Sequence, residues 1–168
     1  MGKLIEQIQV IDMIGAGPVD LDTDRTGDYI SVANYRRALL IFTNAVGTAG
    51  DDWNLTVREA TDASGTGVQD CDIVDEYWIK QAATNLLAVA TFTRTTQTAD
   101  ALIAGNATSA EQACLVVLDL DLARMSEGFD FLGCTVTLDA SGGAQYGSVI
   151  LIPYDARYPQ ATALGALS

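Results

Sequence analysis

Histidine is absent from this chain of 168 residues, and with it the most common general base and metal ligand of enzymes. The usual nucleophilic triads need histidine as well. Pairs of carboxylates could still hydrolyse glycosides, but sequence spacing cannot show two of the 22 acidic residues facing one cleft. The composition therefore favours a protein that is not an enzyme and that uses no cofactor, with no catalytic, cofactor-binding or metal-binding residues to assign.

Positive charge is also scarce. The chain has 9 Lys and Arg residues against 22 Asp and Glu, a formal net charge of -13. A surface of that sign repels the phosphates of nucleic acids and of anionic lipids. We therefore expect no nucleic acid partner and no membrane partner.

No hydrophobic run approaches the roughly 20 residues that span a bilayer. Polar residues interrupt the apolar stretch at the N-terminus, unlike the continuous apolar core of a secretory signal: Glu6, Gln7, Gln9 and Asp12. These features predict a soluble protein that is made and kept in the cytoplasm.

Cysteines are few, odd in number and widely spaced, at Cys71, Cys114 and Cys134. This spacing supports neither a disulfide framework nor a metal site of the C-x-x-C kind. Core packing is the better interpretation for all three.

Strand patterns dominate what is present. Residues 53–60, 131–139 and 145–153 alternate or are rich in β-formers, as half-buried strands are. Trp53 shares the apolar side of its strand and is expected in the core. The same alternation predicts further side chains that point inward: Leu55, Val57, Leu132, Cys134 and Val136.

Shorter apolar runs at 38–43, 86–93 and 114–120 are too continuous to show a face, and their length and β-formers predict buried strands. Residues 28–33 and 76–80 are weaker strand candidates. Residues 98–113 could form a helical turn or an irregular loop. With dense Gly, Ser and Asp turns between the strands, the pattern predicts an all-β, antiparallel β-sandwich of jelly-roll type.

The two ends of the chain differ from its centre. Residues 1–27 combine one short apolar segment with a flexible acidic stretch, and residues 158–168 are small and apolar without a pattern. The expected organisation is an N-terminal arm (1–27), a sandwich (28–157) and a C-terminal tail (158–168). Both ends are expected to order only against a partner.

One acidic segment has the opening spacing of a calcium loop, with Asp20, Asp22 and Asp24 at positions one, three and five. The match then fails. Arg25 stands where the turning glycine should be, and Ser31 stands where a bidentate glutamate should be. A solvated acidic linker is therefore favoured over a cation site.

The loop at residues 60–70, ATDASGTGVQD, contains Gly65 and Gly67 but lacks the lysine and the following helix of a phosphate-binding loop. Asp62 and Ser64 can bind local N–H groups, and the glycines can take positive φ. The chemistry indicates a turn that needs no ligand.

The string LTVREATDASGTGVQD (55–70) resembles a segment of small structural proteins of tailed bacteriophages and prophages, in which a strand ending in QATDASGTG leads into a hairpin. LDLDLARMSEGFDFLGCTVTLDA (118–140) is similar to the strand, acidic turn and Gly-Phe-Asp entry of the same family. YDARYP (154–159) resembles the family's DPRY ending, with Ala156 in place of proline. The resemblance runs from about residue 29 to residue 158.

This resemblance implies a virion component on the outer capsid surface, a decoration or cement protein made in the cytoplasm of a bacterial host. Its implied partners are the major capsid protein and further copies of itself, most simply as a homotrimer at a site where three capsid subunits meet. Two alternatives stay open: a tail or baseplate component, and a carbohydrate-binding jelly-roll module with aromatic residues on one face.

Overall fold

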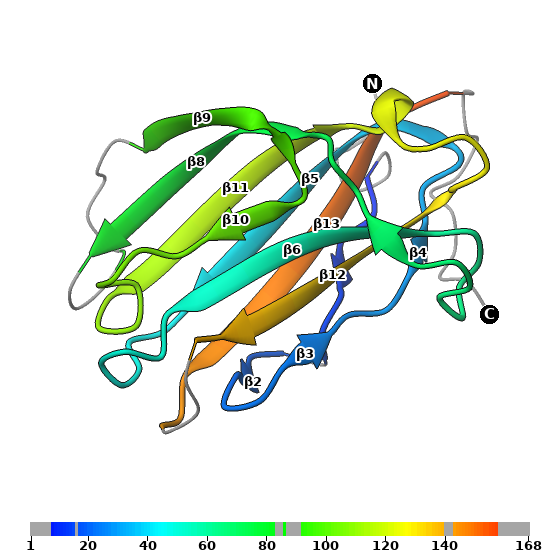
Figure 1. The fold of residues 1–168 in the computed structure, drawn as a ribbon. Helices are drawn as coiled ribbons and strands as arrows, with labels where there is room; N and C mark the ends of the chain where they lie inside the picture. The colour runs from blue at the N-terminus through cyan, green and yellow to red at the C-terminus, as the bar shows by residue number, and fades with distance from the viewer. Residues whose placement is uncertain (1–7, 16, 83–85, 87–91, 140–142, 158–168) are drawn as a thin grey trace.

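The computed structural model describes residues 8–15, 17–82, 86, 92–139 and 143–157. These residues form two antiparallel sheets packed face to face (Figure 1). The predicted all-β sandwich is therefore confirmed. Within the described ranges there is no α-helix, and one short 3-10 helix, η2 (Leu122–Arg124), follows a strand of the larger sheet.

The larger sheet has seven strands and the smaller sheet has six. In the larger sheet the order is β1 (Ile11–Asp12), β13 (Tyr146–Ala156), β5 (Tyr35–Asn44), β11 (Ala113–Asp121), β8 (Val74–Ala82) and β9 (Thr93–Asp100), and β2 (Val19–Asp20) also pairs with β13. In the smaller sheet the order is β10 (Leu102–Ala104), β6 (Trp53–Ala60), β12 (Phe131–Leu138) and β3 (Arg25–Thr26), with β4 (Ile30–Ser31) on β12 and β7 (Gln69–Asp70) on β6.

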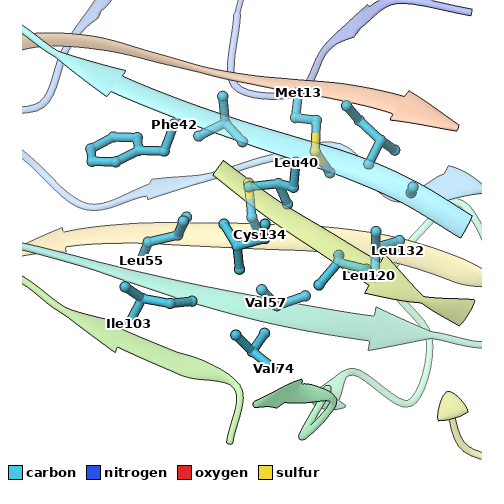
Figure 2. Packing of buried hydrophobic residues seen from close by; sticks show 14 of the residues in the cluster. Met13, Leu40, Phe42, Leu55, Val57, Val74, Ile103, Leu120, Leu132 and Cys134 are labelled. Atoms are coloured by element: carbon cyan, nitrogen blue, oxygen red, sulfur yellow. The ribbon is translucent and has the colours of Figure 1, made fainter. Parts of the chain in front are cut away.

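The core lies between the two sheets, where alternate side chains of each strand meet (Figure 2). Along β6 and β12 the alternation inferred from the sequence holds. Each of the predicted inward residues is buried, with at most 1% of its surface exposed: Leu55, Val57, Leu132, Cys134 and Val136. The two-residue period is the reason, because it places every second side chain of a strand on one face.

Trp53 is fully buried, as expected, and its ring meets Phe42 of the opposite sheet edge-on, with centroids 4.9 Å apart and an interplanar angle of 62°. All three cysteines are free and buried. Burial raises the pKa of Cys114 to about 11 and that of Cys134 to about 12. These thiols therefore stay protonated and behave as small apolar groups, which confirms their predicted place in the core.

The predicted strands at 38–43 and 114–120 lie within β5 and β11, and 76–80 lies within β8. Most of 86–93 falls outside the described residues. Of residues 98–113, expected to be a helical turn or a loop, 105–112 form a loop, whereas the rest belong mostly to the end of β9, to β10 and to the start of β11. The sequence TRTTQTAD of β9 lacks apolar alternation because this edge strand is mostly exposed, so its pairing with β8 decides its conformation.

The structure corrects the expectation of a partner-dependent arm for residues 11–26. Strands β1 and β2 pair with β13, and β3 pairs with β12. Met13 and Leu21 are each only 1% exposed and belong to the core. Two apolar anchors and these backbone pairings outweigh the local acidity and glycine content that suggested a free segment. Residues 1–7 and the expected tail at 158–168 lie outside the described residues.

Replacing Val136 by Asp should lower the free energy of unfolding by about 3–5 kcal/mol, because it buries a carboxylate without a partner. The matched control is Thr135→Asp, at the neighbouring position on the outer side of the same strand. It should cost about 1 kcal/mol, the scale of β-propensity. Urea denaturation measures both, and a larger loss for Thr135→Asp than for Val136→Asp would show that the faces of β12 are reversed.

Met13→Ala and Leu21→Ala should each lower the free energy of unfolding by about 2–5 kcal/mol, since each leaves a cavity in the core. Asp24→Ala, on the exposed turn between them and β3, should stay within about 0.5 kcal/mol of the parent protein. Thermal unfolding followed by circular dichroism makes the comparison. If both core variants were as stable as the parent protein, the original expectation of a free N-terminal arm would be supported instead.

Candidate functional site

The outer face of the smaller sheet is mostly polar, with the exposed Leu102 of the edge strand β10 opposite Thr56. Across β12, β6 and β3, cross-strand neighbours on this side are threonines: Thr135 lies opposite both Thr56 and Thr26. Thr137 lies opposite Asn54 in the next row. This is the usual arrangement of an antiparallel sheet that has its core on one side and water on the other.

The outer face of the larger sheet has an apolar centre instead, bordered by Asp119 opposite Leu39 and by Thr43 and Lys80 opposite Leu115. One row runs directly across four strands, from Ile150 on β13 through Ile41 on β5 and Val117 on β11 to Trp78 on β8. Ile152 and Leu39 are paired in a neighbouring row, and Leu115 lies two residues from Val117. We call these residues the apolar face: Leu39, Ile41, Trp78, Leu115, Val117, Ile150 and Ile152.

Burial along each strand shows that the apolar face points away from the core. On β5, Leu39 and Ile41 are partly exposed, whereas the alternate residues Leu40 and Phe42 are fully buried. On β8, Tyr77 and Ile79 pack against the core. Trp78 lies between them in the sequence and so projects to the other side.

An ion-pair network borders the apolar face at one end. Arg37 forms a two-point contact with Asp119, with Nε 3.1 Å from Oδ1 and Nη2 2.8 Å from Oδ2. The Tyr154 hydroxyl donates to the same carboxylate at 2.6 Å and accepts from Arg37 Nε at 2.9 Å. The bond to Asp119 is the main reason that the pKa of Arg37 is raised, and burial followed by the bond to Asp119 raises the pKa of Tyr154.

Toward the same end of the strands, Glu76 of β8 pairs with Arg94 of β9. Glu76 is two residues from Trp78 and therefore shares its face. The carboxylates Asp119 and Glu76 are thus each neutralised by an arginine of the same chain. Asp12 of the edge strand β1 continues the row opposite Ile150, and its carboxylate accepts hydrogen bonds from the backbone N–H groups of Ile14 and Gly17 instead of pairing with an arginine.

Beyond Arg37 the surface is hollowed, with a volume of about 720 Å³. Most arginines of the chain pair with a carboxylate, but within the described residues Arg36 and Arg157 have none, and both line this hollow. Asp121 and Asp155 line it too. The hollow therefore has mixed charge and suits an ionic contact at the rim of an interface.

The loop at residues 60–70 is a turn, as its chemistry indicated. Asp62 Oδ1 accepts hydrogen bonds from the backbone N–H groups of Ser64 (2.9 Å) and Thr66 (3.0 Å). Gly65 and Gly67 adopt φ of 77° and 66°. The loop thereby satisfies its own backbone groups and leads into β7, which pairs back onto β6.

Glu59, near the C-terminal end of β6, is a buried carboxylate that the sequence pattern does not reveal. Its oxygens accept hydrogen bonds from Gln69 Nε2 at 2.7 Å and from the Ser126 backbone N–H at 3.1 Å. Burial acts to raise its pKa, but these hydrogen bonds outweigh burial and the pKa is lowered. Glu59 therefore joins the loop after β6 to the loop after η2, a structural role.

The acidic segment at residues 20–24 is held by the chain itself. Asp20 Oδ1 accepts from the backbone N–H groups of Asp22 and Gln145, and Asp22 pairs with Arg25 at 3.4 Å. Arg25, which stands at the glycine position of the calcium-loop pattern, thus forms an ion pair with Asp22, one of the three acids of that pattern. Over the ranges that the structure describes, no three His, Cys, Asp or Glu residues are grouped so that they could hold a metal ion.

The sequence contains a pattern that corresponds to the apolar face, but the pattern alone does not show that this face is accessible. Continuous apolar runs in β5, β11 and β13 place apolar side chains on both faces of a strand, which is typical of strands covered on both sides. The runs at 38–43 in β5 and 114–120 in β11 predict buried strands, whereas 145–153 in β13 is grouped with the half-buried strands. In a two-layer sandwich only the inner face is covered, so the outer half of each run remains accessible.

No protein-family model matches this chain, and no curated protein sequence is significantly similar to it. The described part of the chain has no helix with the length and hydropathy needed to cross a membrane.

Glu59→Gln should destabilise the protein by about 1–3 kcal/mol at pH 7, because it removes a buried charged acceptor of two hydrogen bonds. A lowered carboxylate pKa stabilises the fold above the ordinary value of 4.5, and that contribution is lost as pH falls through the folded-state pKa. The difference from the parent should therefore shrink below about pH 4.5.

Glu127→Gln, in the exposed loop that follows Ser126, is the matched control and should change stability little at any pH. Denaturant unfolding between pH 3 and pH 7 provides the measurement. A pH-independent difference between Glu59→Gln and the parent would contradict an ionised Glu59 in the folded state.

Proposed function

We propose that this protein is a structural component of a tailed-phage virion, a decoration or cement protein on the outer surface of the head. The proposal combines the family resemblance with one observation, the apolar face on an otherwise acidic sandwich. Contiguous exposed apolar surface on a soluble domain marks a site of protein association. The rigid two-sheet body lets that surface be presented without a cost of ordering.

The proposed partners are the major capsid protein and further copies of this chain, as a homotrimer, and not nucleic acid or membrane. A protein that binds the assembled lattice but not free subunits makes the lattice harder to open, through mass action alone. No catalytic step is required, and the buried carboxylate Glu59 is already engaged by Gln69 and Ser126. The proposed location is the virion surface after synthesis in a bacterial cytoplasm.

We also infer a jelly-roll order for the sandwich. If β8 and β9 are treated as an added hairpin and the short strands β2, β4 and β7 are set aside, the eight remaining strands nest as first with last, second with seventh, third with sixth and fourth with fifth. The supporting pairs are β1 with β13, β3 with β12, β5 with β11 and β6 with β10. Such nesting of one long folded-over hairpin across two sheets is the jelly-roll plan.

The two alternatives use the same fold differently. A tail or baseplate component would use the apolar face in another part of the particle. A carbohydrate-binding module would need accessible aromatic platforms, and here Trp53 is buried while Trp78 lies between Val117 and Arg94 of the adjacent strands. The aliphatic character of the face favours a protein partner over a sugar.

Heads purified from the phage or prophage that encodes this sequence, stripped of this protein, should bind the purified chain saturably. Bound heads should also withstand a higher temperature before they release DNA. Co-sedimentation and a dye-release melt measure the two effects, with tails from the same preparation as the control. Binding to tails alone would favour the tail alternative, and binding only on a glycan array would favour the carbohydrate module.

A further inference from the structure

We propose that the hollow beyond Arg37 binds an acidic peptide segment of a protein partner, and that Arg36 and Arg157 hold its carboxylate side chains. The hollow lies at the end of the larger sheet where β5 begins, β13 ends and η2 follows β11 (Figure 1). This inference goes beyond the proposed function, because it assigns a ligand chemistry to one hollow and holds for a partner in the head or in the tail.

The first argument is the pairing of the arginines. Five of them form ion pairs with carboxylates of this chain: Arg25, Arg37, Arg58, Arg94 and Arg124. Acidic residues outnumber basic ones by 22 to 9, so a carboxylate is available to most arginines. Within the described residues only Arg36 and Arg157 lack one, and both line the same hollow of about 720 Å³. Two unpaired cations in one concave site of an acidic protein indicate that another molecule supplies their counter-charge.

The guanidinium of Arg157 is held in position by the backbone. Its Nε donates to the carbonyl oxygen of Tyr35 at 3.1 Å, and the backbone N–H of Arg157 donates to the carbonyl oxygen of Asn34 at 2.8 Å. Both terminal nitrogens are left without an acceptor among the described residues. Arg36 is exposed and makes no side-chain hydrogen bond there. A guanidinium with free terminal nitrogens matches the two oxygens of a carboxylate.

The backbone at Asp155 accounts for the unpaired state of Arg36. The ladder pairs the residues on either side of Asp155 with Arg37 and Tyr35, which places Asp155 opposite Arg36. Of the described non-glycine residues only Asp155 has a positive φ, 55°, and the ladder has no pair at this position. The left-handed backbone thus separates two opposite charges that a regular strand would bring together. Strained conformations of this kind are concentrated at ligand-binding sites.

The acids of the hollow favour a peptide over a free anion. Asp121 and Asp155 also line it, so a multiply charged phosphate would be repelled as it approached the arginines. A peptide segment instead offers backbone N–H groups to these acids and its own carboxylates to the arginines. A basic segment would find acids over much of this surface, whereas an acidic segment finds unpaired arginines only here within the described residues.

The net charge of -13 does not prevent this contact. The Debye length is about 8 Å at physiological salt, so acids elsewhere on the surface are largely screened from a segment in the hollow. Hydrogen bonds between a guanidinium and a carboxylate are roughly twice as strong as bonds between neutral groups. The local pairs therefore decide the affinity.

Nuclear magnetic resonance of the full chain, labelled with nitrogen-15, tests the proposal through the arginine Nε–H signals. The probe is the capped peptide acetyl-Ala-Asp-Ala-Glu-Ala-amide. Its neutral counterpart, acetyl-Ala-Asn-Ala-Gln-Ala-amide, has the same shape without the charges. The acidic peptide should shift the Arg36 and Arg157 signals saturably and bind about tenfold more tightly than the neutral peptide. Inorganic phosphate should bind more weakly than the acidic peptide.

Arg36→Gln and Arg157→Gln should each weaken binding of the acidic peptide by about tenfold, and their spectra assign the two signals. The matched control is Arg94→Gln, the same loss of charge at the far edge of the larger sheet, which should leave the affinity unchanged. Arg36 is exposed and makes no hydrogen bond among the described residues, so its replacement should leave the fold intact. Arg36→Gln therefore decides the outcome even if Arg157→Gln, which loses the bond to Tyr35, does not fold.

Three results would overturn the inference: no shift of the two signals with the acidic peptide, equal binding of the neutral peptide, or equal weakening by Arg94→Gln and Arg36→Gln. Phosphate binding as tight as that of the acidic peptide would show a site for free anions and would also overturn it. Heads that fail to bind the parent protein would count against the decoration function alone, because the peptide titration uses no part of the virion.

Discussion

Side chains from both sheets fill one apolar layer between them. The arrangement of the rest of the molecule depends on that layer. Only a strict two-residue period along β5, β6, β11, β12 and β13 allows each strand to contribute to it. The layer has no room for charge, so Glu59, at its margin, is buried only because neighbouring loops donate hydrogen bonds to it. Packing and polar satisfaction thus act together at the end of β6.

The same layer explains why the N-terminal segment is part of the fold. Its strands are only two residues long, and short strands alone stabilise little. Met13 and Leu21 reach the core, and the backbone N–H groups of Met13 and Leu21 bond to Val149 and Gln145. Two anchored side chains are enough to hold an acidic, glycine-containing stretch against both sheets. A segment can therefore be polar in composition and still be integral to a core.

Function in this molecule is a question of surfaces. Among the described residues, Glu59, Asp62 and Asp119 are engaged by hydrogen bonds or ion pairs, and the three thiols are buried. What distinguishes the molecule is the asymmetry of its two outer faces, one lined with threonine and the other with aliphatic side chains. A decoration protein that assembles with its own copies would use such an asymmetry to separate a face that contacts protein from a face that contacts water.

The sequence by itself determined the all-β class, the inward set from Leu55 to Val136, the buried cysteines and the turn at residues 60–70, because each depends on local period or local hydrogen bonding. It did not reveal β9, whose sequence lacks apolar alternation and whose conformation depends on pairing with β8. It also predicted an N-terminal arm, since no local pattern shows that Met13 will lie beside Val149, far along the chain. The tertiary structure alone decided which half of each continuous apolar run faces the core and which half remains accessible, because that choice depends on how many layers the fold has, and the number of layers is a property of the whole chain.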